Sequence, residues 1–274
     1  MPAHILSILL AALTPQGVLP LQSYLSQQET LTASVNGVIG TFLFDTGEGV
    51  TAISPDFAKR VGCKPWGRVT GFRMSGERGG YPHCDNLTFV ASGRALHVPS
   101  AIILDIMKLM GPDITPRVDG AIGLDAFAGA AITIVPRTCI VLETAGSLKR
   151  RTASARRLAI RFVRDAEGVA FSVDAAVPTT QGTAWMELDS GNGGSLVIAN
   201  YIAPLLGLPM DVSTPMPATF KLSDGIEVSG PTRTRDLIMD GNIGARFLNQ
   251  WSLTLDLMQP RAWLTPPDAA SCSP

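Results

Sequence analysis

Residues 42–47 read Phe42-Leu43-Phe44-Asp45-Thr46-Gly47, and residues 186–191 repeat the pattern as Met186-Glu187-Leu188-Asp189-Ser190-Gly191. Each stretch is an apolar run that ends in an aspartate, a hydroxyl residue and a glycine. The residues that follow also match, because Thr51-Ala52-Ile53-Ser54 corresponds to Ser195-Leu196-Val197-Ile198. Self-similarity of this kind is typical of a duplicated structural unit. The sequence therefore predicts two related halves, each presenting one aspartate at the end of an apolar strand.

A second similarity lies further along each half. Asp119 to Phe127 contains Ala121-Ile122-Gly123, and Asp240 to Leu248 contains Asn242-Ile243-Gly244. A strand with period-two character is predicted after each, over residues 132–135 and 253–257. The order of elements is therefore the same twice. The acids that flank these glycines, for which we expect a turn-stabilising role, are Asp119, Asp125 and Asp240.

Turn and helix signals also occur in both halves. Asn36-Gly37 between two apolar runs predicts a hairpin that leads into Asp45, and its counterpart turns at residues 178–182 before Asp189. Ser54 as N-cap with Pro55 at the first helical position predicts a short helix that closes at Gly62. A similar segment runs from Tyr201 to Gly207. Each half is therefore expected to be mainly β with one short helix after the aspartate loop.

Composition supports the same fold class. The chain has 274 residues, of which 46% are hydrophobic and 16% charged, with 27 Gly and 20 Pro. This balance indicates many short strands and turns. The formal net charge of -1 gives no overall attraction for nucleic acid or an anionic membrane.

Basic residues gather in one stretch, around the predicted linker from Ala145 to Arg157. A solvated linker with the outer face of a strand is the favoured interpretation, and a nucleic-acid or lipid patch is the alternative. The members of the cluster are Lys149, Arg150, Arg151, Arg156, Arg157, Arg161 and Arg164.

The N-terminus carries an apolar run from Ile5 to Leu13. It is far below the ~20 residues of a membrane span, and it resembles the core of an export signal without a preceding Lys or Arg. We expect residues 1–20 to be an export signal or an N-terminal apolar segment, and the protein to be periplasmic or secreted. Export would allow disulfides to form among Cys63, Cys84, Cys139 and Cys272. The sequence does not show which of these cysteines pair with each other.

A carboxylate between an apolar strand and a glycine is poorly solvated, and two copies suggest a pair. If the halves pack about a pseudo-two-fold axis, Asp45 and Asp189 meet at that axis. Two carboxylates a few Å apart cannot both ionise cheaply, so the pair shares one proton. Such a pair can activate a water for attack on a carbonyl group.

At these motifs the chain resembles the bacterial pepsin/retropepsin-like aspartic proteases. The resemblance covers nearly all of the chain after about residue 29. It implies two pseudo-symmetric β-barrel lobes, residues 21–147 and 148–274, with a cleft between them. It further implies an aspartic endopeptidase with catalytic Asp45 and Asp189, without metal or cofactor. The supporting residues that it implies are Thr46, Gly47, Ser190 and Gly191.

The resemblance also implies a β-hairpin flap over an extended peptide. The predicted flap lies between Arg68 and Phe89 with its tip at residues 75–81, and Tyr81 is the candidate substrate-binding aromatic residue. An exposed glycine-rich loop is the alternative. The expected partner is a peptide or protein substrate, with no nucleic acid and no stable membrane span, and the chain is expected to be a monomer.

The sequence departs from that family immediately after each motif, where it has Glu48 and Asn192. A third carboxylate turned into the site would raise the pKa values of the pair, whereas Asn192 can form hydrogen bonds without adding charge. Glu187 lies on the same strand face as Asp189, and we expect it to be exposed. Glu48 favours the alternative function, a catalytically inactive relative that binds peptide in the same cleft.

Two further alternatives concern location and chemistry. The chain could instead be a processing enzyme inside the cell, with the N-terminal stretch packed on the first lobe. Its histidines, His4, His83 and His97, lack the spacing of a zinc protease, and no phosphate-binding loop is present. The glycines around residues 191–194 do not form a serine-hydrolase elbow.

Overall fold

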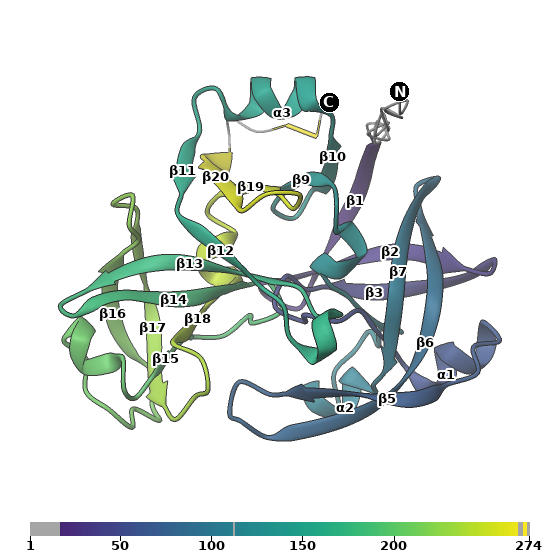
Figure 1. The fold of residues 1–274 in the computed structure, drawn as a ribbon, viewed down its shortest axis with the longest axis horizontal. Coiled ribbons are helices and arrows are strands. Elements are labelled where there is room, and N and C mark those ends of the chain that lie inside the picture. The colour runs from purple at the N-terminus through teal and green to yellow at the C-terminus, as the bar shows by residue number, and fades with distance from the viewer. Residues whose placement is uncertain (1–16, 112, 268–270, 273–274) are drawn as a thin grey trace, which may run out of the picture.

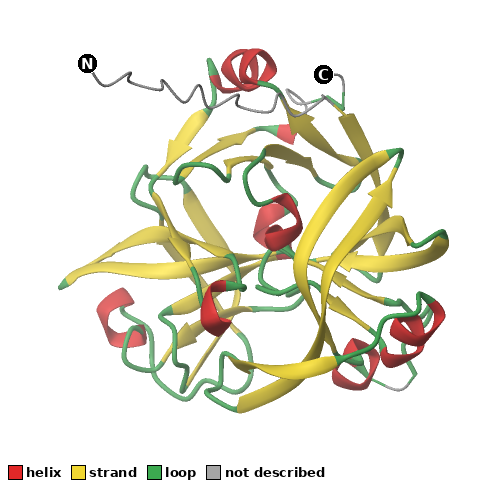
Figure 2. Cartoon of the chain, turned by 45° about the vertical axis from the view of Figure 1, so that its right-hand side comes forward, coloured by secondary structure: helices red, strands yellow, loops and turns green. Residues whose placement is uncertain are grey.

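The computed structural model describes residues 17–111, 113–267 and 271–272 (Figure 1). The predicted export or N-terminal apolar segment spans residues 1–20, of which residues 1–16 lie outside this part of the chain and residues 17–20 begin the first strand. Strands dominate, and the helices are short (Figure 2). The mainly β class is confirmed. The helices are α1 (Pro55–Arg60), α2 (Ile106–Met110), η1 (Leu124–Phe127), α3 (Ala145–Thr152), η2 (Ala166–Gly168), η3 (Ala203–Leu206) and α4 (Ala245–Leu248).

The strands follow the order that the repeat predicts. Those up to the middle of the chain are β1 (Gly17–Tyr24), β2 (Gln28–Val35), β3 (Val38–Phe44), β4 (Ala52–Ile53), β5 (Trp66–Phe72), β6 (Arg78–Ala91), β7 (Arg94–Ile103), β8 (Gly120–Ile122), β9 (Ala131–Val135) and β10 (Cys139–Glu143). The remainder are β11 (Arg156–Leu158), β12 (Ile160–Val163), β13 (Ser172–Thr179), β14 (Gly182–Asp189), β15 (Leu196–Ala199), β16 (Met216–Lys221), β17 (Glu227–Arg235), β18 (Gly241–Gly244), β19 (Ser252–Asp256) and β20 (Arg261–Thr265).

Two sheets carry the duplication. The larger has 13 strands and contains the run β2-β3-β8-β4-β7-β6-β5, and the smaller has seven strands in the order β12-β13-β14-β18-β15-β17-β16. In each, the strand that ends at the aspartate pairs parallel with the glycine-motif strand, β3 with β8 and β14 with β18. A single pairing, Ser34 with Val90, also brings β6 back to β2. The structure therefore shows two sheets of matching strand order, and the barrel-like lobes stay a prediction.

A seam of strands from both halves joins the two parts (Figure 1). β9 of the first half pairs antiparallel with β19 of the second, and the register places Thr133 opposite Thr254. β10 and β1 continue the sheet on one side, and β20 and β11 continue it on the other. The strands predicted at residues 132–135 and 253–257 are confirmed, but their pairing with each other was not predicted.

The local signals act as expected. Asn36 and Gly37 both have positive φ, the geometry of a type I′ hairpin turn, between β2 and β3. The Ser54 side chain accepts a hydrogen bond from the Phe57 amide and caps α1, with Pro55 at its start. Buried Phe42 packs edge-to-face against Phe57 and Phe89, so helix and strands share one core.

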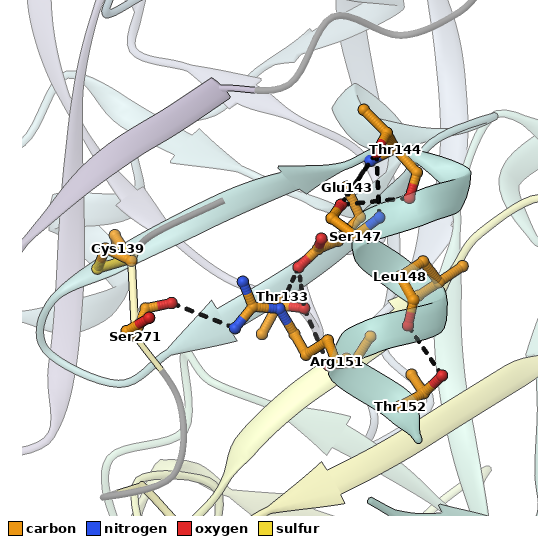
Figure 3. A network of polar contacts seen from close by, with 11 residues as sticks. Thr133, Cys139, Glu143, Thr144, Ser147, Leu148, Arg151, Thr152 and Ser271 are labelled. Atoms are coloured by element: carbon orange, nitrogen blue, oxygen red, sulfur yellow. Dashed lines mark hydrogen bonds and ion pairs between the residues drawn. A yellow bond between two sulfur atoms is a disulfide. The ribbon is translucent and has the colours of Figure 1, made fainter. Parts of the chain in front are cut away.

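The basic stretch differs from the predicted linker because most of it is regular structure. Residues 145–152 form α3, capped by reciprocal hydrogen bonds between Thr144 and Ser147. Arg151 of α3 pairs with buried Glu143 on β10 and donates to the carbonyl oxygen of Ser271, as Figure 3 shows. Arg156 and Arg161 pair with Asp224 and Asp174. The helix is therefore held on the seam by a charged contact, while Lys149 and Arg150 are exposed.

Two disulfides are present, Cys63–Cys84 and Cys139–Cys272. The first joins the loop after α1 to β6, and the second joins β10 to the C-terminal residues. Disulfides persist in oxidising compartments, so their presence agrees with a location outside the cytosol. Within the described residues no helix is long and apolar enough to cross a membrane.

Candidate functional site

The two aspartates lie at the ends of equivalent strands. Asp45 follows β3, and its amide donates to the carbonyl oxygen of Ile122 at 3.1 Å. Asp189 ends β14, in register with Gly244 of β18. Oδ1 of Asp45 accepts hydrogen bonds from its own loop, Gly47 N at 2.8 Å, and from the opposite loop, Gly191 N at 3.2 Å. The fold therefore brings the two predicted site residues together, although 144 positions separate them in the sequence.

The hydroxyl residues tie the two loops together reciprocally. Thr46 Oγ1 donates to the carbonyl oxygen of Leu188 at 2.6 Å and accepts from the Ser190 amide at 3.0 Å. Ser190 Oγ donates to the carbonyl oxygen of Phe44 at 3.1 Å and accepts from the Thr46 amide at 3.0 Å. Thr46 is 1% exposed, so these bonds satisfy backbone groups that water does not reach.

The glycines after the hydroxyl residues allow the close approach. A Cβ placed on Gly47 would lie 2.5 Å from Cγ of Asp189, and a Cβ on Gly191 would collide with the carboxyl group of Asp45. No side chain fits at either position without moving the pair. Gly47 and Gly191 thus allow the two loops to approach closely, and the supporting role predicted for Thr46, Gly47, Ser190 and Gly191 in a functional site stays a prediction.

Burial raises the pKa of Asp45 well above its usual range, and the charges of Asp189 and Glu48 raise it further. The Glu48 carboxyl group lies close enough to the pair for its charge to act on Asp45. Burial, followed by repulsion from Asp189 and Asp125, raises the pKa of Glu48 from 4.5 to about 8. The site therefore holds a third carboxyl group beside the pair, which is the outcome that the sequence left open for Glu48.

A fourth carboxyl group corrects one expectation. Glu187 was predicted to be exposed, but it is 9% exposed and points into the site. Its strand face is covered by Asn242 of β18, whose amide donates to Glu187 Oε2 at 3.1 Å and to Asp189 Oδ2 at 2.6 Å. Burial, with the charges of Asp189 and Asp174, raises the pKa of Glu187 well above its usual range.

The three flanking aspartates were predicted to stabilise turns, but each one accepts a hydrogen bond from a residue far away in the sequence. Asp119 accepts from the Thr41 amide in the middle of β3, and Asp240 accepts from the Trp185 amide in the middle of β14, so each bonds a strand that leads to an aspartate of the pair. Asp125 accepts from both the amide and the hydroxyl group of Thr51. Burial raises the pKa of Asp125 to about 6, and this carboxyl group lies close enough to Glu48 to repel its charge.

A cavity of about 1130 Å³, here called the central cavity, is lined by both halves of the chain, and Glu48, Glu187 and Asp189 are among its lining residues. The β5–β6 hairpin provides one wall. The predicted hairpin is confirmed, but its turn is at residues 73–77 rather than 75–81, and Tyr81 lies on β6 opposite Val69. Tyr81 still lines the cavity. At the turn, the carbonyl oxygen of Met74 accepts from the Ile238 amide of the second half at 3.0 Å.

The raised pKa of Glu48 predicts how stability depends on pH. Glu48 ionises near pH 4.5 in the unfolded chain but near pH 8 in the folded one, so the folded state loses stability as pH rises between these values. We expect Glu48→Gln to be more stable than the wild type by about 1–2 kcal/mol at pH 8.5 and similar at pH 4. Urea denaturation at both pH values measures this. Exposed Glu227→Gln is the control, and an equal gain at pH 4 would contradict the explanation.

Among the described residues no group of His, Cys, Asp and Glu side chains is arranged to hold a metal ion.

Comparison with known proteins defines the fold. No protein-family model matches the sequence, and no curated protein matches it either. Solved structures do match. Basic 7S globulin from soybean aligns with a TM-score of 0.59 at 10% identity, over 94% of this chain and 96% of that one. Conglutin gamma, described as a basic 7S globulin from lupine seeds, gives 0.56 at 10% identity over 94% and 97%, and edgp gives 0.57 at 10% identity over 95% and 98%.

These matches correct the family and the activity expected from the sequence. The three structures named above are described as two basic 7S globulins and as edgp. Membership of the pepsin/retropepsin-like proteases and activity as an aspartic endopeptidase are therefore not retained. In the site, Glu48 and Glu187 place two further carboxyl groups beside the pair. At 10% identity the likeness shows the fold alone.

Proposed function

We propose that this protein binds an extended polypeptide segment in the central cavity and releases it uncleaved, with Asp45 and Asp189 as the polar centre. The observation that carries the proposal is the position of β5. Residues Val69 to Phe72 line the cavity, and β5 is the last strand of its sheet, so that in the described part of the chain one of its edges pairs with no other strand. A free strand edge offers backbone hydrogen bonds to an added extended chain.

The cavity walls suit such a ligand. Apolar side chains on several elements contribute to the lining, and two at its rim, Phe72 and Ile238, are each 61% exposed. Exposed apolar side chains grouped around a cavity are typical of a binding surface. The apolar lining residues include Val50, Val69, Phe72, Met74, Ile102, Leu104 and Ile238.

The polar floor adds selectivity to this apolar frame. Protonated carboxyl groups donate and ionised ones accept, so a floor of Glu48, Glu187 and Asp189 can meet backbone amides and hydroxyl groups. Two lobes, residues 21–147 and 148–274, would form the two walls. We further propose that the protein acts as a monomer in the periplasm or after secretion, where extended polypeptides are available as ligands.

A bulky residue on the cavity wall tests the function. Thr70 on β5 lines the cavity, so Thr70→Trp should lower peptide affinity at least roughly tenfold by filling it, a change of about 1.4 kcal/mol. Thr88→Trp on the exposed face of β6 is the matched control. A mixture of peptides of defined masses would be equilibrated with each protein, and mass spectrometry would identify the bound and free peptides.

The expected result is retention by the wild type and by Thr88→Trp, loss by Thr70→Trp, and peptide masses unchanged throughout. Equal retention by Thr70→Trp would overturn the cavity as the binding site. New, smaller peptide masses that appear with the wild type would overturn release without cleavage.

A further inference from the structure

The two aspartates are held by equivalent strands but by different neighbours. In the first half, the register pairs Leu43 of β3 with Ala121 of β8. In the second half, the corresponding pair is Glu187 of β14 with Asn242 of β18. All four side chains are buried. An apolar pair beside Asp45 is thus replaced by a carboxyl–amide pair beside Asp189.

Asn242 makes a connected set of hydrogen bonds on that side only. Its Nδ2 donates to Asp189 Oδ2 at 2.6 Å and to Glu187 Oε2 at 3.1 Å, so both of its amide hydrogens are used on carboxyl oxygens. Its Oδ1 accepts from Asn192 Nδ2 at 2.8 Å, and the Asn192 backbone amide donates to Asp189 Oδ1 at 2.9 Å. This network fixes the orientation of the Asn242 amide group, because reversing it would place its oxygen against two carboxyl groups.

Asp45 receives donors differently. Its Oδ1 accepts from the amides of Gly47 and Gly191, and in the described part of the chain no side-chain amide reaches this carboxyl group. Both donors to Asp45 converge on Oδ1, whereas in Asp189 each oxygen has a donor, the Asn192 amide for Oδ1 and Asn242 Nδ2 for Oδ2. Donors of this kind favour the ionised form of a carboxyl group.

We propose that Asn242 is a positioning residue that makes the pair unequal, so that Asp189 keeps the negative charge and Asp45 carries the proton. Other charged groups surround the pair and act on both members. Glu48 follows Asp45, Asp125 lies beside Glu48, and Asp174 on β13 lies opposite Glu187. Arg161 reaches this region, but it is paired with Asp174. None of these groups distinguishes the two oxygens of Asp189 as Asn242 does.

The effect of this unequal pair on a ligand rests on the proposed function, the binding of an extended polypeptide. A ligand would place a hydrogen-bond acceptor against Asp45 and a donor against Asp189, which gives a bound polypeptide one preferred direction across the cavity. The protonation states themselves can be tested without any ligand.

The test follows the aspartate carboxyl carbons by NMR of ¹³C-labelled protein from pH 3 to 9, with Asp45→Asn and Asp189→Asn used to assign the two signals. In the wild type we expect the Asp189 signal to ionise first and the Asp45 signal to stay protonated. In Asn242→Ala the pH at the midpoint of the Asp189 signal's titration should rise by about one pH unit or more. Asn200→Ala is the matched control, since Asn200 Nδ2 donates to Asp211 at 2.6 Å and Asp236 at 3.0 Å, outside the group that lines the cavity.

A second variant guards against misfolding. Glu187→Leu with Asn242→Ala installs the pair that already packs beside Asp45, and it should bring the two midpoints closer together. Equal midpoints in the wild type, or unchanged midpoints in both Asn242 variants, would overturn the proposal. Loss of peptide retention in the wild type would overturn the proposed function instead and leave the NMR result unaffected.

Discussion

Replacing Thr46 by Val is expected to destabilise the protein by about 4 kcal/mol, because the change removes one hydroxyl group and leaves two buried backbone groups without partners. The Thr46 hydroxyl group satisfies the carbonyl oxygen of Leu188 and the amide of Ser190, both in the opposite loop. Valine has nearly the same shape, so packing is retained and the loss is due to the hydrogen bonds. Urea denaturation at pH 6 measures the difference.

Thr46→Ser is the matched control, since it keeps the hydroxyl group and loses only a methyl group. We expect it to lie within about 1.5 kcal/mol of the wild type. A Val variant as stable as the Ser variant would show that the hydroxyl exchange between the loops contributes little. The Val variant should also retain less peptide, because the two loops that carry Asp45 and Asp189 would no longer be held together.

Gly191→Ala is expected to disrupt the carboxyl pair itself. The added Cβ would lie closer than 3.0 Å to the Asp45 carboxyl group, a separation that real Cβ atoms essentially never show. Relief requires Asp45 or the 190–192 loop to move, at a cost of roughly 1–3 kcal/mol. Peptide affinity should fall at least about tenfold, since the polar floor of the cavity would be displaced.

Gly193→Ala provides the comparison, because a Cβ there meets its neighbours at an ordinary 3.5 Å. It lies in the same loop and adds the same methyl group. If Gly191→Ala and Gly193→Ala bind peptide equally well, the close approach of the loops has no part in binding. Thermal unfolding of both variants separates a loss of fold from a loss of binding.

Much of the site follows from the repeat in the sequence. Asp45 and Asp189 could be paired from the sequence because their strands, hydroxyl residues and glycines match, and the Asn36-Gly37 turn and the Ser54-Pro55 helix start are local signals. These depend on neighbouring residues, so they can be seen without knowledge of the tertiary fold.

The departures from the repeat could not be placed in the same way. Period-two reasoning put Glu187 on the face of Asp189, but only the parallel pairing with β18 shows that Asn242 covers that face. When the two halves are aligned, Leu43 and Ala121 of the first half correspond to Glu187 and Asn242 of the second. This change from an apolar to a polar pair was the sequence signal from which the hydrogen bonds of Asn242 could have been predicted. The seam between β9 and β19 depends on strands 121 residues apart at Thr133 and Thr254, a distance at which no local signal acts.

The function expected from the motifs was wrong for a related reason. The motifs Asp-Thr-Gly and Asp-Ser-Gly specify how two loops pack against each other, and the two loops are hydrogen-bonded to each other in the structure. Chemistry depends on the surrounding charges, and Glu48, Asp125 and Glu187 come together only in the folded chain.

The seam has a consequence for how the molecule comes apart. β9 and β19 belong to different halves but share one ladder of backbone hydrogen bonds, with Thr133 and Thr254 also joined through their hydroxyl groups at 2.9 Å. Neither half can lose its order without exposing the edge of the other. Calorimetry should therefore record a single melting event, and the amide protons of these two strands should exchange with deuterium at the same slow rate.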